Sequence, residues 1–242
     1  MRLDLYLCEN KLTDSRTEAK KFIESGAVKV NGKLILKPSF DVESDSAEVF
    51  VDKSSKKYVS RGGLKLEAAL DAFSVDPANK LAIDIGASSG GFTDCLLQRG
   101  AKHVIALDSG TSQLVEKLRL DKRVTSMENY NARYMRPVDF EYVPELAVMD
   151  VSFISATYII PSVYNLISDG ADFICLIKPQ FEVGKANIGK GGIVKNEKVR
   201  NEAVKSVIDF AKNTGFLFIK IITSPITGGD GNIEFLAHFK KP

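Results

Sequence analysis

Four charged residues stand where short apolar runs or a predicted helix begin or end. Asp150 and Lys178 each directly follow an apolar run, Glu234 opens the last such run, and Lys65 stands at the start of the helix. In open α/β sheets, ligands bind beyond the carboxyl ends of the strands. The pattern therefore predicts that Asp150 and Lys178 line a ligand site. Taken singly, each of the four also fits a helix cap or a surface charge.

These residue types can activate a hydroxyl group. A hydroxyl oxygen that attacks an electrophilic methyl carbon must lose its proton, and a lysine takes that proton when burial or a second cation lowers its pKa. Lys178 is the candidate base and Lys65 the second cation, while Asp150 and Glu234 would orient the two amines. Nearby carboxylates raise the pKa of a lysine, so the sequence leaves the net shift open.

A glycine-rich turn has the composition of a nucleotide-binding site. An apolar run ends at Asp84, and Gly86, Gly90 and Gly91 follow it before a helical pattern begins. This spacing differs from the G-x-G-x-x-G pattern of dinucleotide sites. A carboxylate at Asp84 suits a ligand with a positive centre and an amino-acid group, such as S-adenosylmethionine. Asp108, 24 residues later, ends the second run and can hold both ribose hydroxyls of an adenosine.

Further residues around this turn complete the predicted cofactor contacts. Ser89 and Phe92 belong to the turn and the helix start, and Asn129, Asn131 and Arg133 are candidates for bordering the adenine. The competing interpretation is a tight strand-to-helix turn with an ordinary acid at the end of the strand. Glycines there would serve only the turn.

Strands and helices alternate through most of the chain and must position these residues. The alternation predicts an α/β fold with a Rossmann-like mixed sheet, mostly parallel and with an antiparallel C-terminal edge, covered by helices on both faces. The domain would span residues 60–242. The predicted strands are 81–85, 103–107, 124–127, 146–149, 173–177, 216–222 and 233–239, and the predicted helices are 92–99, 112–118, 154–167 (interrupted by Pro161) and 196–213.

The first 52 residues show a different, smaller α+β pattern. A helix is predicted over 13–25, with Thr13 or Asp14 as its N-cap and Gly26 just beyond its end. Asn31-Gly32 lies between two short apolar runs and predicts a hairpin with a type I′ turn, and a further strand is predicted over 47–51. The polar segment 53–59 would be a linker.

Cations fall on the predicted helix and hairpin of this small domain. They are candidates for phosphate contacts with RNA; isolated charges of this kind are more often solvated. The candidates are Arg2, Ser15, Arg16, Lys20, Lys21, Lys29 and Lys33.

Composition excludes several classes of protein. The chain of 242 residues has 33 basic and 31 acidic side chains, so its net charge of +2 argues neither for nor against nucleic acid. No apolar run reaches the roughly 18 residues that span a bilayer, and an acid near the N-terminus does not fit a signal peptide. Three separated cysteines and two histidines predict reduced thiols, a cytoplasmic location and no metal site.

The N-terminal motifs resemble the RNA-binding domain named after ribosomal protein S4. The resemblance rests on the helix and the hairpin together and implies binding to structured RNA through phosphates and shape. The matching residues are Arg2-Leu3-Asp4, Ser15-Arg16, Ala19, Ile23, the Gly26–Lys33 hairpin and Lys37-Pro38.

Over nearly the whole chain, the motifs resemble the TlyA-type (hemolysin A) family, whose core is similar to FtsJ-type ribose methyltransferases. The resemblance implies S-adenosylmethionine-dependent 2′-O-methylation of cytidine in ribosomal RNA, within ribosomal subunits and without a metal. It maps the family's Lys-Asp-Lys-Glu tetrad onto Lys65, Asp150, Lys178 and Glu234, and it suggests a lid at 189–192. The matching segments are 58–66, 84–93, 149–153 and 178–184.

Two alternatives remain open at this point. The family name suggests membrane lysis, but the sequence shows no strongly basic amphipathic helix of the kind that lies in a membrane interface. A non-catalytic RNA-binding assembly factor would have the same fold without the reaction. The sequence identifies neither the target nucleotide, nor which ribosomal subunit is modified, nor the oligomeric state.

Overall fold

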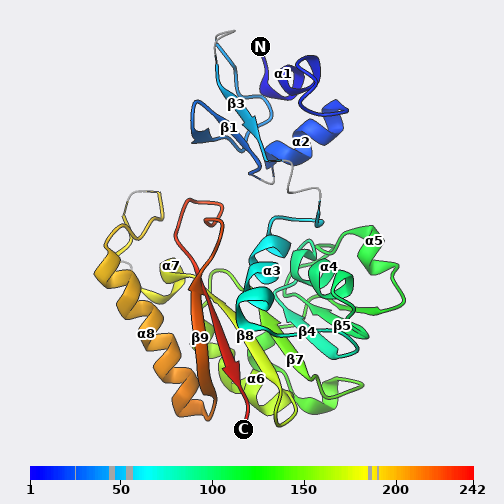
Figure 1. The fold of residues 1–242 in the computed structure, drawn as a ribbon, viewed down its shortest axis with the longest axis vertical. Helices are drawn as coiled ribbons and strands as arrows, with labels where there is room; N and C mark the ends of the chain where they lie inside the picture. Colours follow the sequence, from blue (N-terminus) through cyan, green and yellow to red (C-terminus); the bar gives the residue numbers. More distant parts are fainter. Residues whose placement is uncertain (25, 44–46, 53–56, 185–186, 190) are drawn as a thin grey trace. The chain divides into compact units, whose positions relative to one another are not determined.

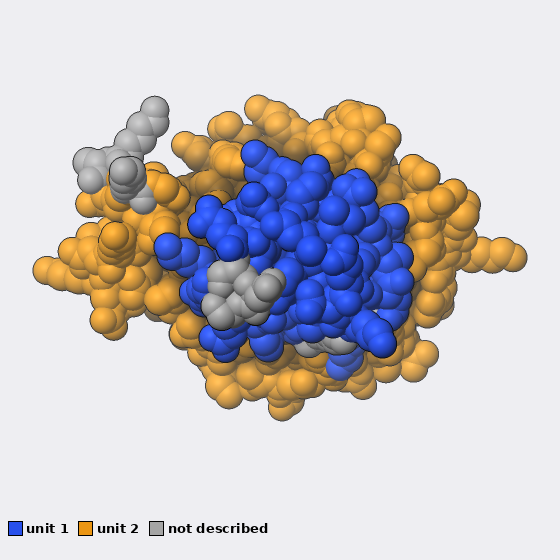
Figure 2. All heavy atoms as spheres, turned by 90° about the horizontal axis from the view of Figure 1, so that it is seen from above, with its two compact units in different colours: residues 1–61 blue, residues 62–242 orange. Residues whose placement is uncertain are grey.

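A computed structural model describes residues 1–24, 26–43, 47–52, 57–184, 187–189 and 191–242. The chain forms two compact units, Met1–Arg61 and Gly62–Pro242, which are coloured separately in Figure 2 and described separately below. Four residues of the predicted linker, 53–56, lie outside the described residues.

The first unit places two helices against a small antiparallel sheet (Figure 1). The hairpin prediction is confirmed: Asn31 (φ 49°) and Gly32 (φ 74°) both adopt the left-handed backbone that a type I′ turn requires. The helices are α1 (Leu3–Glu9) and α2 (Arg16–Glu24), and the strands, in the order β2-β1-β3, are β1 (Val28–Val30), β2 (Lys33–Leu34) and β3 (Val49–Val51).

Two details of this unit differ from the sequence prediction. The second helix begins at Arg16 rather than residue 13, and its cap is Ser15, whose Oγ accepts a hydrogen bond from the Glu18 backbone N–H at 3.1 Å. The first helix was not predicted. It is only seven residues long, and it is held in place by burying Leu3 and Leu7, one turn apart, against the α2 residues Ala19 and Ile23.

The second unit contains a seven-stranded sheet in the order β6-β5-β4-β7-β8-β10-β9. The first five strands of this order are parallel, and β10 pairs antiparallel with both β8 and β9. The predicted fold class is thus confirmed. The antiparallel strand is β10, which lies next to the edge strand β9, whereas the prediction placed the antiparallel strand at the edge itself. The bounds are β4 (Leu81–Ile85), β5 (His103–Leu107), β6 (Val124–Met127), β7 (Leu146–Met149), β8 (Asp172–Ile177), β9 (Leu217–Thr223) and β10 (Phe235–Lys240).

Helices cover both faces of this sheet (Figure 1). On one face α3 packs against α4, and on the other α6 packs against α8. Successive strand residues alternate between the two layers, so Ile83 and Ile85 join the core beneath α6 and α8, whereas Asp84 points to the α4 side. The bounds are α3 (Gly62–Phe73), α4 (Gly91–Gln98), α5 (Glu116–Arg119), α6 (Ile160–Leu166), α7 (Pro179–Glu182) and α8 (Glu197–Thr214).

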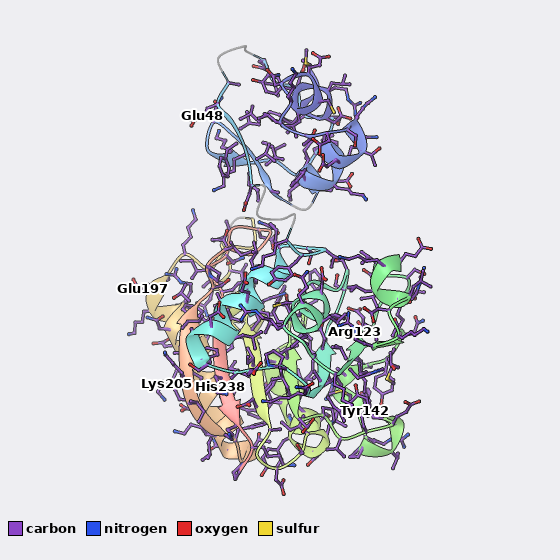
Figure 3. All side chains as sticks on the ribbon, turned by 45° about the vertical axis from the view of Figure 1, so that its right-hand side comes forward. Glu48, Arg123, Tyr142, Glu197, Lys205 and His238 are labelled. Atoms are coloured by element: carbon purple, nitrogen blue, oxygen red, sulfur yellow. The ribbon has the colours of Figure 1, made fainter. Side chains whose placement is uncertain are left out.

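Local chemistry explains where these helices begin. The predicted helix over 154–167 is divided into a 3₁₀ turn, η4 (Ala156–Tyr158), and α6, because Pro161 lacks an N–H and favours the first turn of a helix. Asn196 caps α8 by accepting from the Lys198 and Val199 N–H groups. The outer face of α8 carries Glu197 and Lys205, which point away from the sheet in Figure 3.

Two further 3₁₀ turns, η2 (Ala132–Tyr134) and η3 (Pro137–Asp139), follow β6. Among the described residues, no helix is long and apolar enough to cross a membrane. In the same part of the chain, no group of three or more His, Cys, Asp or Glu residues is arranged to hold a metal ion.

Candidate active site

A cavity of about 430 Å³ lies beyond the carboxyl ends of the parallel strands β4, β5 and β7. Its lining includes Gly86 and Ser88 after β4, Asp108 after β5, and Asp150 and Phe153 after β7. This is the edge at which open α/β sheets bind their ligands. Of the two serines in the glycine-rich turn, Ser88 lines the cavity, whereas the sequence pattern predicted Ser89.

The glycine-rich turn has a shape that only glycines allow. Gly86 adopts φ 84°, and a Cβ added there would lie 2.3 Å from the Asp150 backbone oxygen. Gly90 adopts φ 95°, and its added Cβ would lie 2.3 Å from Leu118 Cδ1. The turn can therefore pass close to β7 and α5 because side chains are missing at these two positions.

Ser89, Gly91 and Phe92, the other predicted members of the turn, are not among the described residues that line the cavity. Gly91 and Phe92 form the buried start of α4, and the Ser89 carbonyl accepts from the Val115 N–H at 3.4 Å. Asn131 lines the cavity and accepts from the Arg133 N–H, whereas Asn129 Oδ1 accepts from Thr111 Oγ1 at 2.6 Å. The structure thus places Asn131 in the cavity wall.

Asp84 is a fully buried carboxyl group with an incomplete set of partners. Thr93 Oγ1 donates to its Oδ2 at 2.7 Å, while Oδ1 has no partner among the described residues. Burial, followed by the charge of Asp150, raises the pKa of Asp84 to about 7. A cationic ligand with N–H donors would favour the charged form, so the residues fit the amino-acid end of S-adenosylmethionine.

Asp108 is held in place by the backbone. Its Oδ2 accepts from the Ser88 N–H and its Oδ1 from the Gly110 N–H, both at 2.7 Å. Asp108 lines the cavity, and each of its oxygens retains a further lone pair that a hydroxyl group of a ribose could use. This arrangement supports the predicted role of Asp108.

The four residues of the tetrad form two ion pairs. Lys178 Nζ lies 2.6 Å from Asp150 Oδ1 and donates to Ser152 Oγ at 2.8 Å. Lys65 Nζ lies 2.5 Å from Glu234 Oε2, and both side chains are almost fully buried. Because Phe235 pairs with Ile177 in the antiparallel register, Glu234 directly precedes β10 at the level of Lys178. The fold therefore brings the two pairs to the same edge of the sheet.

Sequence reasoning missed several residues that shape this edge. Ser152 and Glu182 contact the loops that carry the tetrad. Asn232 accepts from the Val194 N–H and donates to the Gly192 carbonyl, both at 3.0 Å, which links the segment of the predicted lid to the loop before β10. Lys190, within that lid, lies outside the described residues. No local pattern marks these contacts, since each joins residues at least 26 positions apart.

In the first unit, two candidate RNA contacts also have a structural role. Arg2 and Arg16 both donate to the buried carboxylate of Asp4, at 2.9–3.1 Å. The Arg2 hydrogen bond is the largest cause of an Asp4 pKa of about 2. Both guanidinium groups remain about half exposed, and Ser15 is the cap of α2. The candidates Lys20, Lys21, Lys29 and Lys33 are exposed.

Replacing Asp84 with asparagine is expected to raise the stability of the ligand-free protein and to abolish cofactor binding. The pKa is about 7 in the folded chain and about 3.9 when unfolded, so the folded state binds more protons between these values and loses stability as pH rises. The gain in the free energy of unfolding of the Asp84→Asn variant over the wild type should be absent near pH 4 and reach up to about 4 kcal/mol at pH 8. Denaturant titrations at the two pH values measure it, and an equal gain at both would contradict this assignment.

Comparison with known proteins adds to the geometry. The sequence pattern of the FtsJ-like methyltransferase family matches residues 58–241, and that of the S4 domain matches residues 1–47. Hemolysin A of Brachyspira hyodysenteriae is 44% identical over 241 residues, covering 99% of both chains. The 16S/23S rRNA (cytidine-2′-O)-methyltransferase TlyA of Mycobacterium tuberculosis is 40% identical over 234 residues, covering 97% of this chain and 87% of that protein.

Solved structures give the same picture of the fold. A structure described as a hemolysin from Streptococcus thermophilus is 46% identical, with a TM-score of 0.79 over 100% of this chain and 88% of the other. An S-adenosylmethionine-dependent methyltransferase from Mesorhizobium loti, only 14% identical, has a TM-score of 0.53 over 72% of this chain and 96% of the other. The latter similarity concerns the fold alone.

Proposed function

The chain belongs to the TlyA-type (hemolysin A) family of FtsJ-like methyltransferases with an S4 domain, and on this basis we propose that it methylates the 2′-hydroxyl of cytidine in ribosomal RNA. The methyl donor is S-adenosylmethionine. The observation that carries the proposal is the ion pair of Lys178 with Asp150, a residue that lines the cavity. A binding-only protein has no need of a lysine and a carboxylate paired there.

The residues of the cavity divide between the cofactor and the reaction. Asp84, buried behind the lining, would pair with the positive amino-acid end, Gly86 and Ser88 would allow close approach of the backbone, and Asp108 would hold the ribose. When bound, the cofactor would supply a methyl group carried on a sulfonium sulfur, and that sulfur would leave as a neutral thioether. No metal is needed for such a leaving group.

The tetrad acts on the acceptor. Lys178 Nζ takes the proton of the 2′-hydroxyl while that oxygen forms its bond to the methyl carbon. Asp150 and Ser152, which both line the cavity, hold the amine. The Lys65–Glu234 pair lies at the same edge of the sheet and would supply a second cation there. The proton then passes to solvent, which restores the base.

An exposed aromatic ring supports RNA as the acceptor. Phe153 lines the cavity, yet 91% of its surface is exposed to solvent. A phenylalanine in this position offers a face on which a nucleobase taken out of its stack can lie.

The first unit would dock on structured rRNA of a ribosomal subunit. A protein that acts on ribosomal subunits would work in the cytoplasm.

Charge reversal on α2 and the hairpin is expected to weaken docking without changing cofactor affinity. Lys20→Glu and Lys29→Glu each remove one exposed cation, so the slope of log affinity against log salt should fall by about 1 per variant. Lys198→Glu is the matched control, because it reverses an exposed lysine in the first turn of α8, where an acid is tolerated. Filter binding of rRNA at several salt concentrations measures the slopes, and equal slopes in all three variants would refute the docking surface.

Transfer of label tests the function directly. The protein is incubated with tritiated S-adenosylmethionine and unmodified ribosomal subunits or free rRNA, and the RNA is hydrolysed in alkali. A labelled alkali-resistant dinucleotide containing cytidine is expected, since a 2′-O-methyl group blocks cleavage. Cofactor binding without any label in RNA would favour the non-catalytic assembly factor, and label released by alkali would assign a different acceptor atom.

A further inference from the structure

The one-turn helix α7 contacts the loop after β7 at two points. It begins directly after Lys178, and its last residue, Glu182, reaches the segment that follows Phe153. Ser155 Oγ donates to Glu182 Oε2 at 2.5 Å, and the Ala156 N–H donates to Glu182 Oε1 at 2.8 Å. One carboxylate therefore binds two donors of the neighbouring loop with its two oxygens.

The second contact involves the aromatic ring beside the cavity. Phe181 packs against Phe153 with ring centroids 5.2 Å apart and the rings tilted by 52°. Phe153 adopts φ 64°, a left-handed backbone that is unfavourable for a bulky residue. Such a conformation persists only where the surroundings hold it. The α7 contacts lie at Phe153 itself, through Phe181, and two to three residues beyond it, at Ser155 and Ala156.

Together with the Lys178 contacts, these contacts join the 178–182 segment to the 150–156 segment at both of its ends. At one end, Lys178 contacts Asp150 and Ser152. At the other end, Glu182 contacts Ser155 and Ala156. We propose that Glu182 is a positioning residue, which holds the 150–156 segment so that the Phe153 ring and the Lys178 amine face the same acceptor nucleotide. This inference rests on the proposed function.

The chemistry of Glu182 suits this task. The side chain is partly buried, and burial raises the pKa of its carboxyl group, with Ser155 and Ala156 favouring the charged form. A glutamine of the same shape could accept from the Ala156 N–H and donate to Ser155 Oγ, which would then donate to Thr157 Oγ1, 2.7 Å away. Glutamine should therefore preserve the geometry, and alanine should lose it.

The test compares Glu182→Ala with Glu182→Gln, Ser155→Ala and a control, Glu145→Ala. Glu145 also accepts a backbone N–H, that of Leu81 at 3.0 Å, but it does so where β4 begins, at the opposite edge of the sheet. We expect Glu182→Ala to lower kcat on the order of 10- to 100-fold, with the KM for rRNA and the Kd for S-adenosylmethionine changed far less. Ser155→Ala should give a smaller loss, and Glu182→Gln and Glu145→Ala should keep kcat near that of the wild type.

Three outcomes would overturn the proposal: an unchanged kcat in Glu182→Ala, a Glu182→Gln variant as slow as the alanine variant, or losses that only follow the unfolded fraction of each variant. If Glu182→Ala does not fold, Glu182→Gln and Ser155→Ala carry the comparison.

Hydrogen–deuterium exchange keeps this test separate from that of the function. Amides of residues 150–158 should exchange faster in the Ser155→Ala and Glu182→Ala proteins than in wild type or Glu145→Ala, whether or not the wild type transfers methyl groups. Unchanged exchange would refute the positioning role on its own. A wild-type protein without transfer activity, but with the faster exchange in the variants, would instead refute the proposed function.

Discussion

Replacing Lys178 with alanine is expected to lower the rate of methyl transfer to rRNA by a factor on the order of 10²–10⁴, the usual contribution of a general base. Lys178 Nζ contacts Asp150 and Ser152, which both line the cavity, so an acceptor hydroxyl group bound there would lie near the amine. Asp84 and Asp108 stay in place, so the Kd for S-adenosylmethionine should change little. Single-turnover transfer and cofactor titration measure the two effects separately.

An arginine at position 178 distinguishes the role of Lys178 as a base from its role as a partner in the ion pair. Lys178→Arg can keep the contact with Asp150 but cannot give up its proton near neutral pH, so it should be as inactive as the alanine variant. Lys80→Ala is the matched control: Lys80 pairs with Asp172, the first residue of the same strand β8, at the opposite edge of the sheet. If Lys178→Arg transferred methyl groups at the wild-type rate, the site would need only a positive charge at position 178, and the residue would not act as a base.

The sequence predicted the sheet better than the side-chain contacts of the site. Strands such as β4 and β5 have the bounds expected from their apolar runs, because a strand buried on both faces is marked by its own residues. The position of Asp150 and Lys178 at one edge followed from the parallel topology. The contact of Glu182 with Ser155 followed from nothing local, since it depends on how two loops fold together.

Polar residues in the first unit show the same limit. From the sequence, Arg2 and Arg16 are interpreted either as phosphate contacts with RNA or as solvated surface charges. In the structure they also neutralise Asp4, which is fully buried and would be costly to leave unpaired. Nothing in the spacing of residues 2, 4 and 16 reveals this, because α1 and α2 must first pack together.

Removing the carboxylate of Glu234 is expected to destabilise the protein by about 3–5 kcal/mol, since it leaves Lys65 as an unpaired buried cation. Glu234 is 2% exposed and Lys65 is 8% exposed, and Gly228 packs directly against the Glu234 carboxylate. Little water can reach the amine to replace the lost partner. Urea denaturation of Glu234→Ala, compared with Lys80→Ala for a more exposed pair, measures the difference.

A double variant distinguishes a structural role of this pair from a catalytic one. Lys65→Met with Glu234→Leu removes both charges while filling similar space, and such replacements are often neutral or stabilising. We expect its stability to return toward that of the wild type while methyl transfer stays low, because the second cation at the edge that carries Lys178 is gone. If transfer recovers together with stability, the pair only supports the fold around β10, and Lys178 with Asp150 performs the chemistry alone.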